Sequence, residues 1–172
     1  MLARTTMRIA AAVALTVGML MVPVGSLAQS AGTVLKPADT EKLLADKVYY
    51  KGQSATTQIR NSGGIKFADG YYVLSTMVDT SGYSSDVQAK YQAYFITEVA
   101  IKIGGHDLPA GIYGIGFVGE KLIVTDVGAH DLFTVPTVQD AAIKRPMPLQ
   151  MLIDPAGGYR LYALRHYVTI SR

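Results

Sequence analysis

An alternation of apolar and polar residues between positions 91 and 103 restricts the fold of this chain more than any other feature. The apolar positions are Tyr91, Ala93, Phe95, Val99, Ile101 and Ile103, interrupted by Thr97, and the polar positions are Gln92, Glu98 and Lys102. Successive side chains of a β-strand point to opposite faces, so a period of two predicts one long strand with a buried face.

Shorter apolar segments, separated by Gly, Asp and Pro, follow the same pattern elsewhere. We expect further strands at 48–51, 56–60, 65–67, 71–78, 112–118, 121–127, 132–135, 149–153 and 159–171. We expect turns at 61–64, 104–111, 119–120, 128–131 and 155–158, and helical turns at 40–46, near Ser85 and within 136–144. The sequence therefore predicts an all-β protein, an antiparallel β-sandwich or flattened barrel of about eight to ten strands with one or two short helices.

The first 28 residues have the character of a cleavable export signal. Arg4 and Arg8 supply positive charge, the run 9–22 is mostly apolar, and Ser26 and Ala28 place small residues before a cleavage site after Ala28. The run is shorter than the roughly 20 residues that span a bilayer, and an uncleaved anchor is the alternative. We therefore expect a chain without a membrane span after cleavage, exported to the periplasm or the extracellular medium.

The expected mature chain is 144 residues, the 172 of the sequence less the 28 of the signal. We expect an extended leader with a short helix at 29–46 and a single β domain at 47–172, which is an ordinary domain size. The chain has no cysteine, so it has neither a disulfide nor a lipid-anchored cysteine. Its mature charge is nearly balanced, with 14 basic against 13 acidic residues, because Arg4 and Arg8 lie in the signal. Nucleic-acid binding needs a basic face and is not expected.

A G-x-G-x-x-G motif runs from Gly114 to Gly119. A dinucleotide site needs a helix after this motif, whereas 121–127 has the pattern of a strand. We therefore expect no nucleotide cofactor, and we expect the glycines to allow close approach of a neighbouring segment.

The sequence G-x-H-D-L occurs twice, at Gly104–Leu108 and at Gly128–Leu132, in both cases at a predicted turn. If the intervening strands form a hairpin, His106, Asp107, His130 and Asp131 come to the same end of a sheet. Such a group predicts a ligand-binding site, with His106 and His130 as candidate metal ligands, or an acid–base pair. The alternative is turn chemistry alone, because Gly and Asp are common turn residues.

The remaining histidine and the tyrosines are predicted to be structural. His166 lies on the apolar parity of the last strand, where a histidine is usually a hydrogen-bonded core residue. The chain has 11 tyrosines and no tryptophan. Adjacent pairs such as Tyr71-Tyr72 point to opposite faces of a strand, so one interpretation is an exposed tyrosine face that stacks on sugars or packs on a partner. The alternative, which we favour, is ordinary β-propensity with burial of the rings.

The segment Leu108-Pro109-Ala110-Gly111-Ile112-Tyr113 resembles the L-P-A-G-x-Y start of a strand in exported bacterial β-sandwich families, including the DUF2911-type proteins. The resemblance covers 99–118. It implies a β-sandwich in the bacterial envelope and transfers no functional residue to this chain.

Together these features predict an exported β-sandwich that binds a small molecule or an envelope component, without a cofactor. Two alternatives remain open. One is a metal-dependent or acid–base enzyme that uses the two G-x-H-D-L turns. The other is a structural envelope protein that pairs through a sheet edge near 146–153.

Overall fold

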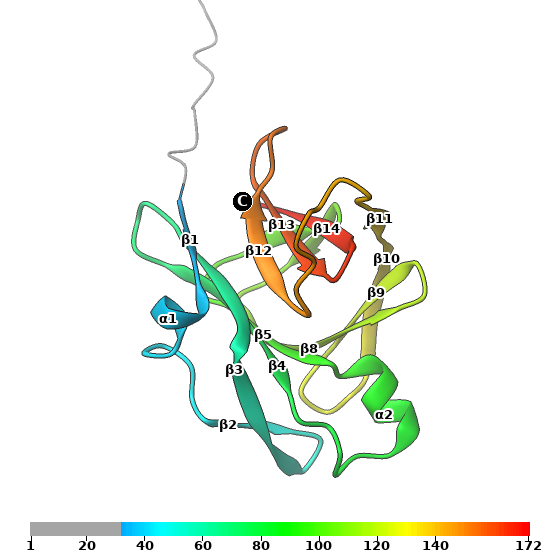
Figure 1. Ribbon diagram of the computed structural model, residues 1–172. Coiled ribbons are helices and arrows are strands. Elements are labelled where there is room, and N and C mark those ends of the chain that lie inside the picture. Colours follow the sequence, from blue (N-terminus) through cyan, green and yellow to red (C-terminus); the bar gives the residue numbers. More distant parts are fainter. Residues whose placement is uncertain (1–31) are drawn as a thin grey trace, which may run out of the picture.

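The computed structural model describes residues 32–172, and the predicted export signal with its cleavage site lies outside them. The described chain forms fourteen strands and two short helices, arranged as two antiparallel sheets (Figure 1). The sheets do not close into a barrel, so the predicted all-β, sandwich-like fold is confirmed. No helix in the described range is long and apolar enough to cross a bilayer.

The larger sheet has eight strands in the order β1-β3-β4-β5-β8-β9-β10, with β2 paired to β3. Its strands are β1 (Thr33–Leu35), β2 (Lys47–Tyr50), β3 (Gln53–Lys66), β4 (Tyr72–Val78), β5 (Ala93–Thr97), β8 (Gly111–Val118), β9 (Lys121–Thr125) and β10 (Asp131–Pro136). The helices α1 (Pro37–Thr40) and α2 (Ser85–Lys90) both contact strands of this sheet.

The smaller sheet has six strands in the order β12-β13-β14-β6-β7, with β11 paired to β14. Its strands are β6 (Ile101–Ile103), β7 (His106–Leu108), β11 (Val138–Gln139), β12 (Gln150–Ile153), β13 (Tyr159–Ala163) and β14 (His166–Ser171). The strand β12 is an edge strand, as Pro146 and Pro148 predict.

The predicted long strand at 91–103 is wrong, because the chain passes from one sheet to the other within it. β5 belongs to the larger sheet and β6 to the smaller sheet. The break follows Thr97, whose hydroxyl donates a hydrogen bond to the Val99 carbonyl. The alternation survives because Phe95 and Ile103 both face the space between the sheets, and both are fully buried there.

Other local predictions also differ from the structure. The expected strand at 159–171 is the hairpin β13–β14, which turns at Leu164 with a φ of 55°. The expected turn at 61–64 lies inside β3, and the expected helix at 136–144 is replaced by β11 and turns. The helix expected at 40–46 is α1, which ends at Thr40, whereas the helical turn near Ser85 is confirmed as α2.

The main core lies between the two sheets and is mostly aliphatic. Its fully buried members include Ile115 and Leu122 from the larger sheet and Leu161 and Ile170 from the smaller sheet. Burial of one such side chain contributes about 1.5–3 kcal/mol. This core fixes which face of each strand points outward.

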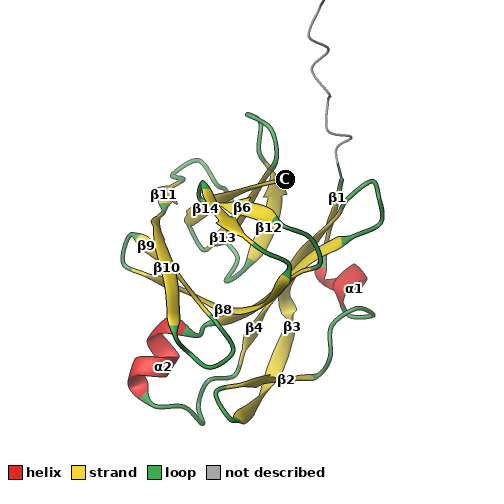
Figure 2. Cartoon of the chain, turned by 180° about the vertical axis from the view of Figure 1, so that it is seen from behind, coloured by secondary structure: helices red, strands yellow, loops and turns green. Residues whose placement is uncertain are grey.

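Figure 2 shows β2 and α2 on the side of the larger sheet that faces away from the smaller sheet. A second core lies on this outer face. Half of its eight buried residues form a group that we call the tyrosine cluster: Tyr50, Tyr83, Tyr91 and Tyr94. The rings of Tyr50 and Tyr91 are stacked with centroids 3.6 Å apart, and Tyr83 meets both rings edge-on. Aromatic contacts of this kind therefore add to the aliphatic packing on this face.

The G-x-G-x-x-G segment packs directly against this second core. A Cβ on Gly114 would lie 2.5 Å from the ring of Tyr50, and a Cβ on Gly116 would lie 2.5 Å from the carbonyl oxygen of Lys90. The prediction that these glycines allow close approach is therefore confirmed for both positions. Gly119 has a different role, since it turns the chain between β8 and β9 with a φ of 59°.

Candidate functional site

The structure places the two predicted His-Asp pairs in different sheets. His106 and Asp107 are the first two residues of β7, in the smaller sheet, and not in a turn as expected. Asp131 begins β10, in the larger sheet, and His130 precedes it in the β9–β10 turn. The predicted hairpin between the two motifs does form, from β8 and β9, but β7 leaves this sheet to pair with β6.

Each side chain of the first pair has its own partner. The carboxylate of Asp107 forms an ion pair with Lys102 across the β6–β7 hairpin, and both side chains are more than half exposed. The imidazole of His106 stacks on Phe133 of β10, with ring centroids 4.9 Å apart and an angle of 11°. His106 thus lies beside the edge of the larger sheet.

The second pair is held by its own turn and by α2. Asp126 accepts hydrogen bonds from the backbone of Gly128 and His130 and from Nδ1 of His130, and this last distance is 2.9 Å. These bonds, led by the one from the His130 backbone, lower the pKa of Asp126. Asp131 pairs instead with Lys90 at 2.8 Å. Ala129 has a φ of 68°, so the residue that adopts the left-handed conformation in this turn is not a glycine.

No hydrogen bond, ion pair or ring contact joins the two His-Asp pairs within residues 32–172. The same range contains no group of three or more His, Cys, Asp and Glu residues placed to hold a metal ion. The metal-dependent or acid–base enzyme therefore stays a prediction from sequence.

His166, the third histidine, is half-buried at the start of β14. Its Nδ1 lies 3.3 Å from the hydroxyl of Thr137, within hydrogen-bonding distance. This agrees with the prediction of a hydrogen-bonded structural histidine.

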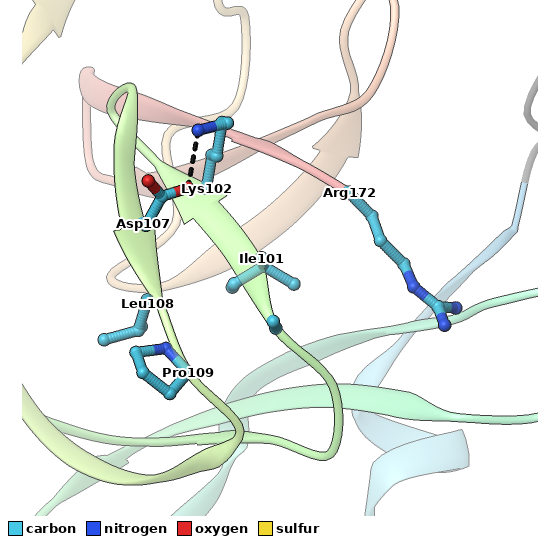
Figure 3. A pocket seen from close by; sticks show the side chains of 7 residues that line it. Ile101, Lys102, Asp107, Leu108, Pro109 and Arg172 are labelled. Atoms are coloured by element: carbon cyan, nitrogen blue, oxygen red, sulfur yellow. Dashed lines mark hydrogen bonds and ion pairs between the residues drawn. The ribbon is translucent and has the colours of Figure 1, made fainter.

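Asp107 also borders an open cavity, which the sequence did not predict (Figure 3). The cavity has a volume of about 360 Å³, and we call it the hairpin groove. It is lined by Ala100, Ile101, Lys102, Asp107, Leu108, Pro109 and Arg172. The β6–β7 hairpin supplies most of this lining, and the end of the chain supplies Arg172.

The floor of the hairpin groove is apolar and its two sides are charged. Ile101 and Leu108 face each other across the β6–β7 ladder, and Pro109 follows them. Figure 3 shows the Lys102–Asp107 pair on one side and Arg172 on the other. The guanidinium of Arg172 bonds Asp69 at 2.6 Å, and it lies 5.1 Å from the centroid of the Phe67 ring. The cation is thereby held in place by a carboxylate and an aromatic face.

The outer face of the smaller sheet carries a group that sequence reasoning missed. We call it the arginine network, and its members are Asp140, Asp154, Arg160, Tyr162 and Tyr167. Arg160 bonds Asp154 at 2.9 Å and the Tyr162 hydroxyl at 3.4 Å, and this hydroxyl donates to Asp140 at 2.8 Å. The Arg160 guanidinium also lies 4.3 Å from the centroid of the Tyr167 ring.

Burial and hydrogen bonding shift the ionisation of this network. Asp154 is 5% exposed, and its hydrogen bond from Arg160 lowers the pKa of its carboxyl. The hydrogen bond from Tyr162 lowers the pKa of Asp140, while burial raises the pKa of Tyr162. The network therefore joins two loops, after β11 and after β12, to the centre of the smaller sheet. No motif marks it in the sequence, because its members come from four separate segments.

Most tyrosines are buried, as the alternative based on β-propensity predicts. Tyr49 is 62% exposed and Tyr71 is 49% exposed. Tyr71 lies near the hairpin groove through Arg172, whose guanidinium is 5.9 Å from the centroid of its ring.

No protein-family model, curated protein or solved structure matches this chain. The resemblance of 99–118 to exported β-sandwich families thus stays a prediction.

Proposed function

We propose that this protein is an exported β-sandwich that binds a small amphipathic molecule in the hairpin groove. The observation that carries the proposal is the combination, in one groove, of an apolar floor and charged sides. A volume of about 360 Å³ falls in the range of ligand pockets, which is roughly 300–1,000 Å³. It suits a molecule of small size and not a protein domain.

The floor favours the apolar part of such a ligand. Pro109 and Ala100 are exposed, and they stand next to the buried side chains of Ile101 and Leu108. A hydrocarbon placed against these residues leaves water, which stabilises the complex by about 25 cal/mol for each Å² removed.

The Lys102–Asp107 pair favours an acidic group at the end of the ligand. An exposed ion pair of this kind contributes only about 0–1 kcal/mol to stability. Because Lys102 and Asp107 are 54% and 83% exposed, a carboxylate from a ligand can replace Asp107 beside Lys102 at little cost. Arg172 can remain with Asp69 on the opposite side, where its stem borders the groove. We therefore expect an amphipathic acid to bind better than the corresponding alcohol.

Titration calorimetry of residues 29–172 with octanoate and with octanol tests the proposal. We expect saturable binding of octanoate and weaker binding of octanol. Ala100→Phe should abolish both by filling the groove, whereas Ala156→Phe, in the exposed β12–β13 turn, should change neither.

The charge is tested separately with Lys102→Gln, which should remove the preference for octanoate over octanol. Lys121→Gln on β9 is the matched control and should leave this preference intact. No binding of either compound, or binding that Ala100→Phe leaves unchanged, would refute the hairpin groove as the ligand site.

A further inference from the structure

A second groove lies between α1 and the middle of β3. Its volume is about 680 Å³. One wall comes from α1 and the residue after it, namely Pro37, Ala38 and Glu41. The other wall is the β3 segment 57–61. We call this cavity the bulge groove.

The β3 wall is an enlarged β-bulge. Gln58 pairs with Met77, and the next paired residue of β3 is Ser62, opposite Thr76. The strand thus advances four residues while β4 advances one, so 59–61 have no cross-strand partner. Bulges free peptide groups from the ladder and turn side chains toward a new direction, and they are frequent next to binding sites.

Buried hydroxyl groups brace the bulge against α1. The hydroxyl of Thr40 lies 2.6 Å from the hydroxyl of Ser62, and both residues are almost completely buried. The Ser62 hydroxyl also lies within hydrogen-bonding distance of the Ile59 carbonyl, inside the bulge, and the Thr40 hydroxyl within hydrogen-bonding distance of the Pro37 carbonyl in α1. Each hydroxyl has one proton, so one of the two donates to the other and the second donates to its backbone carbonyl. The two walls are therefore linked through side chains, and the bulge groove is formed before any ligand arrives.

The groove carries opposite charges on its opposite walls. Glu41 stands on the α1 side and Arg60 on the bulge, and both side chains are exposed. Neither forms an ion pair with another residue in the part of the chain that the structure describes. Gln58 and Asn61 also line the groove. The Asn61 side-chain amide donates a hydrogen bond of 3.1 Å to the Gln58 side-chain oxygen, which leaves the Asn61 side-chain oxygen and the Gln58 amide N–H groups for a further partner.

From this arrangement we propose that the bulge groove is a second binding site, for a zwitterionic ligand of the size of an amino acid or a dipeptide. Arg60 takes the carboxylate in a charge-assisted hydrogen bond, and Glu41 takes the ammonium group. The amides of Gln58 and Asn61 bond the polar backbone between these ends. An uncharged sugar would use the amides but neither charge, so charge dependence separates the two classes of ligand.

The probe is L-alanyl-L-alanine, titrated into residues 29–172 and followed by NMR shifts of the backbone amides. We expect saturable shifts at 58–62 and none for the same dipeptide acetylated and amidated at its ends. Arg60→Gln and Glu41→Gln should each weaken binding by about tenfold or more, as loss of a charged hydrogen bond does. Arg145→Gln and Glu120→Gln, both exposed and outside the bulge groove, should leave it unchanged.

Ala100→Phe, which fills the hairpin groove, should leave dipeptide binding intact, so failure at one groove is distinguishable from failure at the other. The amide spectrum of each variant shows whether the fold is retained. Equal binding of the free and the blocked dipeptide overturns the proposal, and so does the absence of shifts at 58–62 at millimolar dipeptide.

Discussion

The outer faces of the two sheets are covered in opposite ways. On the larger sheet, β2 and α2 lie over the outer face, and the tyrosine cluster packs there with the rings of Tyr50 and Tyr91 stacked. On the smaller sheet no helix of residues 32–172 covers the outer face, and side chains of the arginine network lie over the strands instead. The same residue type, tyrosine, serves in both places, in one as a packing group and in the other as a hydrogen-bond donor to a carboxylate.

This difference shows two ways of shielding the outer face of a sheet from solvent, one with further secondary structure packed on it and one with side chains alone. The tyrosine cluster depends on shape, since Gly114 and Gly116 must lack side chains to admit Tyr50 and α2. The arginine network depends on charge, since Asp154 is buried and needs Arg160 beside it. The first face should therefore be sensitive to volume and the second to charge and pH.

The largest effect is expected when the arginine network loses its cation. Arg160→Met leaves Asp154, which is 5% exposed, without its ion-pair partner. Removal of one member of a buried pair costs about 3–5 kcal/mol. Urea unfolding of the variant measures this loss, with Arg145→Met, on the exposed loop, as a control that should change little. A loss under about 0.5 kcal/mol would mean that solvent already satisfies Asp154.

A smaller but clear effect is expected when volume is added to the tyrosine cluster. Gly114→Ala places a methyl group 2.5 Å from the Tyr50 ring, and overpacking of this kind costs about 1–3 kcal/mol. Gly82→Ala is the control, because its methyl group would meet nothing closer than 3.5 Å. Equal stability of the two variants would contradict the dependence of this face on shape.

Acid should weaken the smaller sheet and leave the tyrosine cluster unaffected. Asp140 and Asp154 have a lowered pKa in the folded protein. A lowered carboxyl pKa stabilises the fold above the unfolded value of about 3.9, and this contribution disappears as the pH falls through the folded value. Urea midpoints measured from pH 6 down to pH 2 should therefore fall steeply below about pH 4.

The contribution of Asp154 is isolated by substitution. Asp154→Asn should lower stability at pH 7 and make the fall below pH 4 shallower. Tyr91→Phe should keep the full acid dependence, since no carboxylate bonds this side chain in the described structure. The same slope in Asp154→Asn as in the unsubstituted protein would assign acid sensitivity to other groups, such as Asp126.

The smallest effects compare two hydroxyl groups within the tyrosine cluster. The Tyr50 hydroxyl lies 2.6 Å from the hydroxyl of Thr125, whereas that of Tyr91 is buried without a partner among the described residues. Tyr50→Phe should cost about 1 kcal/mol, and Tyr91→Phe should be neutral or slightly stabilising. A cost for Tyr91→Phe similar to that for Tyr50→Phe would point to a buried water bound to the Tyr91 hydroxyl.

The sequence predicts the fold class because alternation reports burial on one face of a strand, whichever sheet the strand joins. The same property explains the errors at 91–103 and 159–171, where the pattern continues through a change of sheet and through a turn. Leu164 turns the chain with a positive φ, and leucine is not a residue that signals a turn. Alternation alone therefore predicts which side chains share a face of a strand, but not where the strand begins or ends.

The candidate sites were less predictable, since they depend on which segments meet. Of the four predicted residues, only Asp107 lines the hairpin groove. Arg172 and Asp69 form a hydrogen bond although they are more than a hundred residues apart in the sequence, and no local pattern indicates such a contact. The turn predicted at 61–64 rests on Gly63 and Gly64, although β3 continues to Lys66. The bulge at 59–61 falls mostly in the strand predicted at 56–60, and no residue pattern indicates it.

The switch between sheets after Thr97 has a consequence for the order in which the protein can fold. Most strands of the larger sheet pair with sequence neighbours, so this sheet can assemble early through local contacts. β6 instead pairs with β7 and with β14. Ile103 of β6 lies opposite Ile170 of β14, which is 67 positions later in the sequence. A chain that emerges from its amino end thus exposes one edge of the β6–β7 hairpin until β14 appears. During this interval the open edge is the point most prone to wrong pairing with another chain, and truncation of β14 would make that exposure permanent.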